Sequence, residues 1–95
     1  MRIEWHPLAS TDLAELMTYI ARDSVKAAYR LHDEIRRQTS ILATHPEAGR
    51  VGRVSGTREL VITGTPYIAA YRLSSEVITI LRLLHGAQRW PRSLR

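Results

Sequence analysis

Three strand-like segments follow one another in the second half of the chain, and the connections between them are very short. The segments cover residues 57–63, 66–73 and 76–84 and are rich in Val, Ile, Thr and Tyr. Gly64-Thr65 and Ser74-Ser75 separate them. A parallel pair needs a crossover of about a dozen or more residues, so neighbouring segments must run antiparallel. The sequence therefore predicts an antiparallel meander that buries one face against the rest of the chain.

The first half of the chain supplies the layer that covers this sheet. Residues 8–22 carry an apolar stripe at helical spacing, and a second stripe continues after Ser24 as far as His45, before Pro46. Asp23 and Ser24 can cap the second helix. Because the connection between the two helices is so short, they should form an antiparallel hairpin. A short strand is expected at 2–5. The predicted fold class is α+β in the order β-α-α-β-β-β, with a helix hairpin packed on a mainly antiparallel sheet in a single domain, residues 1–95.

Composition restricts the chemistry that is open to the chain. It has no cysteine, which excludes disulfides and thiolate metal sites. No segment approaches the roughly 18 apolar residues of a membrane span, and no signal peptide precedes His6-Pro7, so we expect a cytoplasmic protein without a membrane partner. The histidines lack metal-ligand spacing, and neither a phosphate-binding loop nor a nucleophile elbow occurs. We therefore expect no metal and no cofactor.

Positive charge is concentrated in the second half of the chain. Residues 1–49 hold six basic and seven acidic side chains, whereas residues 50–95 hold eight arginines against Glu59 and Glu76. Thirteen of the fourteen basic residues are arginine, which binds planar anions well. This asymmetry indicates a polyanionic partner, either nucleic acid or an acidic protein. The plain alternative is a solvated basic face.

The third strand segment runs out at His85, where a histidine can act as a general acid or base near neutral pH. For an isolated histidine, capping the strand end is the commoner role. Gln88 and Arg89 supply further hydrogen-bond donors beside it. Strict alternation along the strand predicts two rows of side chains. They are Val77, Thr79, Leu81, Leu83 and His85 on one side, and Ile78, Ile80, Arg82 and Leu84 on the other.

Arginines from the strands and from the polar loop at 47–56 are predicted to line one cationic surface that contacts phosphates. The alternative is that each arginine pairs with Glu59 or Glu76 or is solvated. Trp90, followed by Pro91, is interpreted as an anchor that pins the tail to the domain. The arginines of the predicted surface are Arg50, Arg53, Arg58, Arg72 and Arg82.

Several residues and segments occur together in an order and spacing typical of one family. They are Trp5, Ala9, Asp12-Leu13, Tyr19-Ile20-Ala21, Pro46 and Gly49-Arg50, followed by GTRELV, TPYIAAYRL and ILRLLHGAQRWP. Over essentially its whole length the chain thus resembles the ParE/RelE superfamily of toxins from bacterial type II toxin-antitoxin modules. The resemblance implies the same α+β fold and a growth-arresting toxin restrained by an antitoxin that wraps its surface.

The resemblance also implies two branches with different targets. RelE-like toxins cut mRNA in the ribosomal decoding site without a metal, whereas ParE-like toxins poison DNA gyrase. In the nuclease set His85 falls where some members place a catalytic histidine, but Ile68-Ala69-Ala70-Tyr71 lacks the arginine of the middle strand and Gly86 replaces an aromatic residue. Losing one such donor costs ~10²–10³ in rate. The run YRLSSEVITILRLLH resembles the ParE branch instead.

We therefore expect a toxin that targets DNA gyrase without catalysing a reaction. The alternative is a ribosome-dependent mRNA endonuclease, and a third hypothesis is an inactive member that only binds its antitoxin. For the nuclease, the candidate catalytic residues are His85, Arg72, Arg82 and Arg58. For target or nucleic-acid binding, the candidates are Arg50, Arg53, Gln88 and Arg89.

The expected protein partner is a cognate antitoxin. A segment that folds on binding would suit the exposed edge of the sheet and the groove beside the helix pair. Because residues 50–95 are basic, we expect the antitoxin to be acidic where it meets them.

Overall fold

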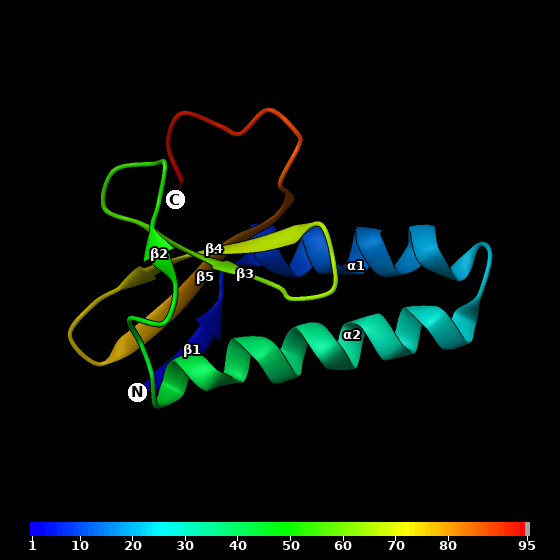
Figure 1. Ribbon diagram of the computed structural model, residues 1–95, viewed down its shortest axis with the longest axis horizontal. Coiled ribbons are helices and arrows are strands. Elements are labelled where there is room, and N and C mark those ends of the chain that lie inside the picture. Colours follow the sequence, from blue (N-terminus) through cyan, green and yellow to red (C-terminus); the bar gives the residue numbers. More distant parts are fainter. Residues whose placement is uncertain (95) are drawn as a thin grey trace.

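The computed structural model describes residues 1–94 as two layers, with a helix hairpin on one side of a five-stranded sheet (Figure 1). The helices are α1 (Pro7–Ala21) and α2 (Val25–Ser40), and a short 3-10 turn, η1 (Ile41–Ala43), follows α2. The strands are β1 (Arg2–Trp5), β2 (Arg50–Val51), β3 (Arg58–Val61), β4 (Tyr67–Leu73) and β5 (Val77–His85). No helix within residues 1–94 has the length and apolar character needed to cross a membrane.

The predicted meander is confirmed, since β4 pairs antiparallel with both β3 and β5. The full strand order is β1-β5-β4-β3-β2, and β1 pairs with β5 in parallel, so the sheet is mixed. Strand β2 is a two-residue addition within the stretch predicted as a loop, and it pairs antiparallel with β3. The first strand, β1, thus lies beside the last strand, β5. Strand β5 is therefore a central strand, with β1 on one side and β4 on the other.

Helix α1 begins one residue before the predicted residue 8, and α2 begins directly after the predicted cap residue Ser24. The Oγ of Ser24 accepts a hydrogen bond from the N–H of Ala27 at 3.0 Å, and His6 caps α1 by accepting from the N–H of Leu8 at 3.0 Å. The second helix ends earlier than the predicted His45, because α2 tightens into η1 after Ser40. The Oγ of Ser40 donates to the carbonyl of Arg37, a local bond that competes with continued helix.

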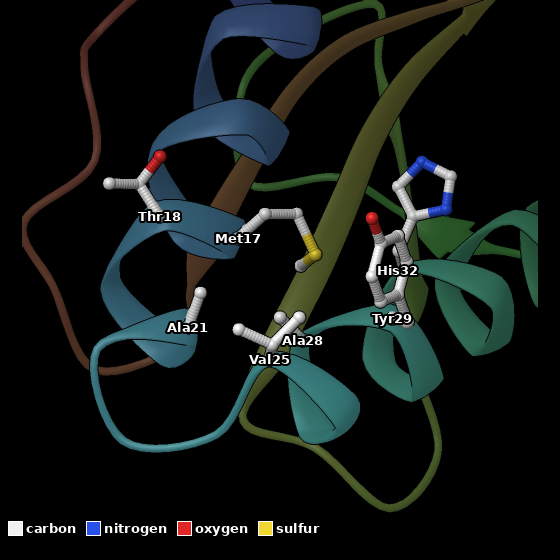
Figure 2. A pocket seen from close by; sticks show the side chains of 7 residues that line it. All are labelled: Met17, Thr18, Ala21, Val25, Ala28, Tyr29 and His32. Carbon is white, nitrogen blue, oxygen red and sulfur yellow. The ribbon is translucent and has the colours of Figure 1, made fainter.

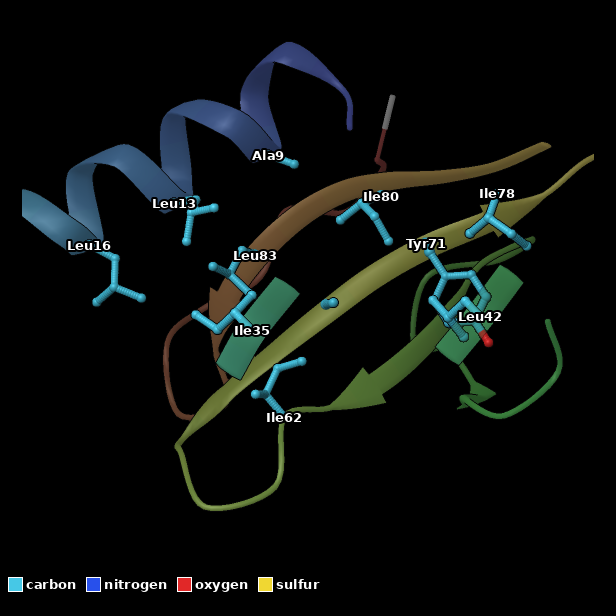
Figure 3. Packing of buried hydrophobic residues seen from close by; sticks show 11 residues of the cluster. Ala9, Leu13, Leu16, Ile35, Leu42, Ile62, Tyr71, Ile78, Ile80 and Leu83 are labelled. Carbon is cyan, nitrogen blue, oxygen red and sulfur yellow. The ribbon is translucent and has the colours of Figure 1, made fainter. Parts of the chain in front are cut away.

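The main core lies between the helix pair and the inner face of the sheet (Figure 3). Tyr71 on β4 is fully buried there, and its hydroxyl donates to the carbonyl of Pro46 at 2.8 Å. The same oxygen accepts the N–H of Gly49 at 2.9 Å. A Cβ at Gly49 would lie 2.6 Å from the Tyr71 ring, so only glycine fits. This contact fastens the segment after η1 to the middle of the sheet.

A second, smaller cluster covers the outer face of the sheet, opposite the helices. Ala70 and Leu81 are buried beneath Leu94, with Val54 and Trp90 packed beside them. The chain after β5 therefore crosses back over the outer face, as its path in Figure 1 shows. The prediction that Trp90 anchors the tail is confirmed.

The alternation predicted for β5 is wrong beyond Ile80. Tyr71 pairs with Ile80 but Ala70 pairs with Arg82, so Leu81 is an extra residue in a β-bulge. Its side chain lies in the outer cluster, whereas Ile80 and Leu83 belong to the main core. The bulge shifts the alternation by one residue. Consequently His85 lies on the helix side of the sheet, together with Ile80 and Leu83. Strict alternation would have placed Arg82 on that side instead.

Candidate functional site

His85 lines a polar pocket of about 270 Å³ between α1 and the ends of β4 and β5. The pocket combines acidic, basic and amide side chains with a small apolar floor. Its lining residues are Asp12, Glu15 and Leu16 of α1, Tyr67, Arg82, Leu83, Leu84 and His85 of the strands, and Gln88. The structure thus brings together three predicted site residues, His85, Arg82 and Gln88. We call this cavity the His85 pocket.

The turn after β5 fixes the histidine ring. Nδ1 of His85 accepts the N–H of Ala87 at 3.0 Å, and the side-chain oxygen of Gln88 accepts the backbone N–H of His85 at 2.7 Å. The ring also packs edge-on against Tyr67, with centroids 5.5 Å apart. Because Nδ1 is an acceptor, this bonding pattern assigns the proton of the neutral ring to Nε2. Nε2 makes no hydrogen bond with any residue of 1–94 and is the atom left for chemistry or recognition.

Arg82 is paired with a carboxylate inside the His85 pocket. Its Nε and Nη2 donate to the two oxygens of Asp12 at 2.7 and 3.0 Å, and the N–H of Leu83 donates to the same carboxylate at 2.9 Å. The hydrogen bonds from Arg82 to Asp12 raise the pKa of the arginine above its ordinary value. Glu15 lines the same cavity and adds a second carboxylate. The arginine of the pocket is therefore already neutralised.

The other two candidate catalytic arginines lie at the opposite end of the sheet. Tyr67 pairs with His85 but Arg72 pairs with Thr79, so the two positions on β4 are about 17 Å apart along the strand. Arg58 pairs with Tyr71, next to Arg72. The structure places His85 and Arg82 in one pocket and leaves Arg58 and Arg72 outside it.

Arg58 and Arg72 both bind backbone carbonyls. Arg58 donates from Nε to the carbonyl of Gly49 at 3.0 Å and from Nη2 to that of Glu47 at 3.3 Å. Arg72 donates from Nη2 to the carbonyl of Leu94 at 3.0 Å. These contacts hold the loop after η1 and the C-terminal segment against the sheet.

A buried carboxylate organises two of the loop arginines. Glu59 on β3 is 2% exposed and accepts hydrogen bonds from Arg50 at 2.9 Å and from Nε of Arg53 at 3.0 Å. Burial raises the pKa of Glu59, but the hydrogen bonds from Arg53 and Arg50 outweigh it and hold the pKa below its ordinary value. The guanidinium of Arg53 also stacks over Trp90, 3.8 Å from the ring centroid. Trp90 in turn donates from Nε1 to the carbonyl of His85 at 3.2 Å.

Two further hollows lie on the helix side of the molecule. An apolar pocket of about 310 Å³ opens between α1 and α2 near their connection, where Met17 projects toward the second helix (Figure 2). Val25 and Tyr29 beside it are 59% and 70% exposed. A larger groove of about 770 Å³ runs between α2 and the end of β3 that extends beyond β2, and Leu60 and Val61 line it. We call it the α2–β3 groove.

The side-chain amide of Gln38 closes one end of the α2–β3 groove by forming hydrogen bonds with the backbone of Thr63, as a neighbouring strand would. Its amide oxygen accepts the N–H of Thr63 at 2.7 Å and its amide nitrogen donates to the carbonyl of Thr63 at 3.0 Å. Glu34 accepts a further hydrogen bond from the same amide nitrogen at 2.6 Å. The backbone edge after β3 is therefore covered at Thr63, which limits strand pairing there.

Sequence reasoning missed the two acidic members of the His85 pocket. Neither Asp12 nor Glu15 was predicted from the sequence to have a role in the site, although their spacing of three residues puts them on one helix face. That spacing is the signal that would have found them as a pair. Within residues 1–94 no group of three or more histidine and carboxylate side chains is placed to hold a metal ion.

Comparisons with known proteins agree with this architecture. A family model described as "ParE toxin of type II toxin-antitoxin system, parDE" matches residues 3–90. A protein of Sinorhizobium fredii named "Putative toxin Y4kP" is 42% identical over 93 residues, which cover 98% of this chain and 96% of that protein. A solved structure titled "Chromosomal ParDE TA system from P. aeruginosa" superposes with a TM-score of 0.80 at 27% identity, covering 90% of this chain and 95% of the other.

Proposed function

Because the chain belongs to the ParE toxin family of type II toxin-antitoxin systems, we propose that it arrests growth by binding DNA gyrase without catalysing a reaction. As a toxin of this type it has a cognate antitoxin that restrains it. Gyrase is the target that the ParE branch implies, and the sequence of β4 and β5 resembles that branch. The His85 pocket favours a binding mechanism over a nuclease mechanism.

The observation that supports a non-enzymatic mechanism is the ion pair between Arg82 and Asp12. Cleavage of a phosphodiester places negative charge on the phosphorane, and a fixed, uncompensated cation must stabilise it. Among residues 1–94, Arg82 is the only arginine that lines the His85 pocket, and it is already bound by Asp12, while Glu15 lines the same cavity. A phosphate brought to Nε2 of His85 would meet two carboxylates and one arginine. The electrostatics of the pocket therefore oppose phosphate cleavage.

The decisive experiment measures gyrase activity and RNA cleavage with the same proteins. Purified toxin is expected to inhibit gyrase supercoiling and to accumulate cleaved DNA, and His85→Gln should do so as well as the wild type. In cells that express the toxin, mapped mRNA ends should show no in-frame cuts. Cuts that disappear with His85→Gln, together with normal supercoiling, would favour the mRNA endonuclease. A chain that arrests no growth when expressed alone would be an inactive, antitoxin-binding member.

We place part of the antitoxin interface, within the same proposal, in the α2–β3 groove. Val61 is 45% exposed there and lies on the part of β3 that β2 leaves unpaired, between the residues paired with β2 and Thr63, which Gln38 covers. An extended segment of the antitoxin can pair with this edge while its apolar side chains enter the groove. Val61→Glu should weaken antitoxin binding, whereas Val25→Glu at the far end of the hairpin should leave it unchanged. The opposite ranking would move the interface to the apolar pocket of Figure 2.

A further inference from the structure

We propose that the outer face of the sheet binds the phosphodiester backbone of DNA through a set of arginines, three of which are held in place by other residues. The arginine face, as we call it, consists of Arg50, Arg53, Arg72, Arg89 and Arg92. The choice of DNA rests on the proposed function, because a toxin on gyrase is held next to the DNA that the enzyme is cutting. The binding itself depends only on the charge and geometry of this face.

Three segments far apart in the sequence converge on this face. Arg50 and Arg53 come from β2 and the loop after it, and Arg72 comes from β4. Arg89 and Arg92 lie on either side of the partly buried Trp90, which packs against the outer cluster. In Figure 1 the tail runs above the sheet on the side away from α1 and α2. The docked tail thus adds Arg89 and Arg92 to the arginines of the loop and the strand.

The charge of the two layers differs sharply. Residues 7–40, which contain both helices, hold five basic and five acidic side chains and are neutral overall. On the arginine face, Glu59 is the one carboxylate that contacts the arginines within residues 1–94. The excess positive charge of the chain is therefore concentrated opposite the helix hairpin, where it can attract a polyanion.

Three of the five arginines of this face, Arg50, Arg53 and Arg72, are held in place before any ligand binds. Glu59 fixes Arg50 and Arg53 through their Nε and Nη2 atoms, and the Trp90 ring fixes the plane of the Arg53 guanidinium. Arg72 is tied to the carbonyl of Leu94 by Nη2. Within residues 1–94 these bonds leave the Nη1 groups of all three arginines without a partner. A restrained guanidinium loses less rotamer entropy on binding, so this arrangement favours phosphate contacts more than a freely solvated basic surface would.

The face suits a nucleic-acid backbone better than an acidic peptide. Guanidinium groups match phosphate oxygens in a bidentate geometry and need no pocket. A peptide that folds on binding needs apolar anchoring sites. The apolar pocket between the helices and the α2–β3 groove, which offer such sites, are lined by residues of the helices, the η1 segment and β3, not by the arginine face.

The test measures binding of the full-length toxin, freed of antitoxin, to a short fluorescent DNA duplex by anisotropy, in the absence of gyrase. The dissociation constant is followed between about 50 and 200 mM salt, because each phosphate contact contributes about −0.9 to the slope of log K against log salt. The double variant Arg89→Gln/Arg92→Gln should reduce the magnitude of this slope by about 2. Neither residue forms a hydrogen bond or ion pair within residues 1–94, so the fold should be kept.

The matched control is Lys26→Gln/Arg30→Gln, which removes the same charge from exposed positions on α2. We expect it to leave the salt slope unchanged. Equal slopes for the two double variants would overturn the proposal, because binding would then follow net charge alone. Loss of antitoxin binding in the Arg89/Arg92 variant with normal DNA binding would also overturn it and would assign the face to an acidic protein.

Two further measurements distinguish DNA from RNA as the ligand, and the DNA-binding proposal from the gyrase proposal. Single-stranded RNA of the same length should bind more weakly than the duplex, and tighter RNA binding would contradict the assignment to DNA. Supercoiling assays with the same variants keep the gyrase proposal distinct. A wild-type toxin that binds DNA through Arg89 and Arg92 but spares gyrase would refute only the proposed function. Gyrase inhibition with no loss of DNA binding in the variant would refute only this inference.

Discussion

Asp12 of α1 binds Arg82 of β5, seventy residues further along the chain, through two hydrogen bonds, and it also accepts the N–H of Leu83. Strand β1 ends opposite Ile80, so beyond this point β5 has lost its neighbour on that side. The Asp12 carboxylate accepts the N–H of Leu83 on β5, which a longer β1 would otherwise have bound. One side chain thereby joins the helix layer to the sheet and sets the charge of the His85 pocket.

Replacing Asp12 with Asn should lower the free energy of unfolding by about 1–3 kcal/mol, because the charge-assisted bonds to Arg82 and Leu83 are lost. Urea denaturation provides the measurement. The exposed pair Arg2–Glu4, with side chains 68% and 54% exposed, offers the control. Glu4→Gln should change stability by less than about 0.5 kcal/mol. Similar losses for the two variants would show that the Asp12–Arg82 contact is as weak as a surface pair.

Replacing Tyr71 with Phe should cost about 1–3 kcal/mol, although the ring remains the same size. The reason is that the N–H of Gly49 and the carbonyl of Pro46 both lose their partner in a buried place. Tyr29, 70% exposed, provides the matched control, and Tyr29→Phe should have almost no effect. Thermal and urea unfolding of the two variants would test this. A Tyr71→Phe protein as stable as the wild type would mean that water replaces the hydroxyl.

Stability should fall in acid through Glu59. Its pKa is lowered in the folded protein, so its contribution is complete above the ordinary glutamate pKa of about 4.3 and is lost as the pH falls through the lowered folded value. Urea midpoints measured between neutral pH and strong acid should therefore decrease less steeply for Glu59→Gln than for the wild type. Glu76 is exposed and its carboxylate contacts no described residue, so Glu76→Gln should keep the wild-type slope. An acid slope in Glu59→Gln identical to that of the wild type would contradict this assignment.

Trp90 should control the order of the tail. Trp90→Phe keeps an aromatic ring under Arg53 but loses the hydrogen bond from Nε1 to His85, and should cost about 1 kcal/mol. Trp90→Ala also removes packing from the outer cluster and should cost about 2–4 kcal/mol. Hydrogen exchange of residues 89–94 should quicken more in the alanine variant. Unchanged exchange in Trp90→Ala would show that Leu94 alone holds the tail.

Most of the secondary structure could be predicted because its signals are local. The two helices carry apolar stripes and caps, and the short turns at Gly64-Thr65 and Ser74-Ser75 dictate an antiparallel meander. The partner of β1 could not be predicted, because its pairing with β5 joins the two ends of the chain and leaves no local trace. The bulge could not be predicted either. Ile80 and Leu81 are both apolar, so their sequence does not show that an extra residue lies between the two paired stretches of β5.

In the candidate site, too, the residues close together in the sequence could be predicted as a group, and the contacts between distant residues could not. His85 and Gln88 were predicted together because they lie three positions apart in the sequence, and the tail anchor was predicted from Trp90 and the Pro91 that follows it. The partner of Arg82 was missed because Asp12 lies in the other half of the chain. Arg58 and Arg72 were grouped with Arg82 because their strands are adjacent, but adjacency does not give the position along a strand. The register places them far from His85.

The bulge at Leu81 also determines how relatives of different length should be compared. Deleting a residue inside a central strand ordinarily turns every later side chain to the opposite face. Here the deletion of Leu81 would remove the one residue that has no partner on β4, and Arg82 to His85 would keep both their partners and their faces. The outer cluster would lose one buried side chain. A related chain one residue shorter in this strand should therefore be aligned with its gap at position 81, within the strand, and not in either of the neighbouring turns.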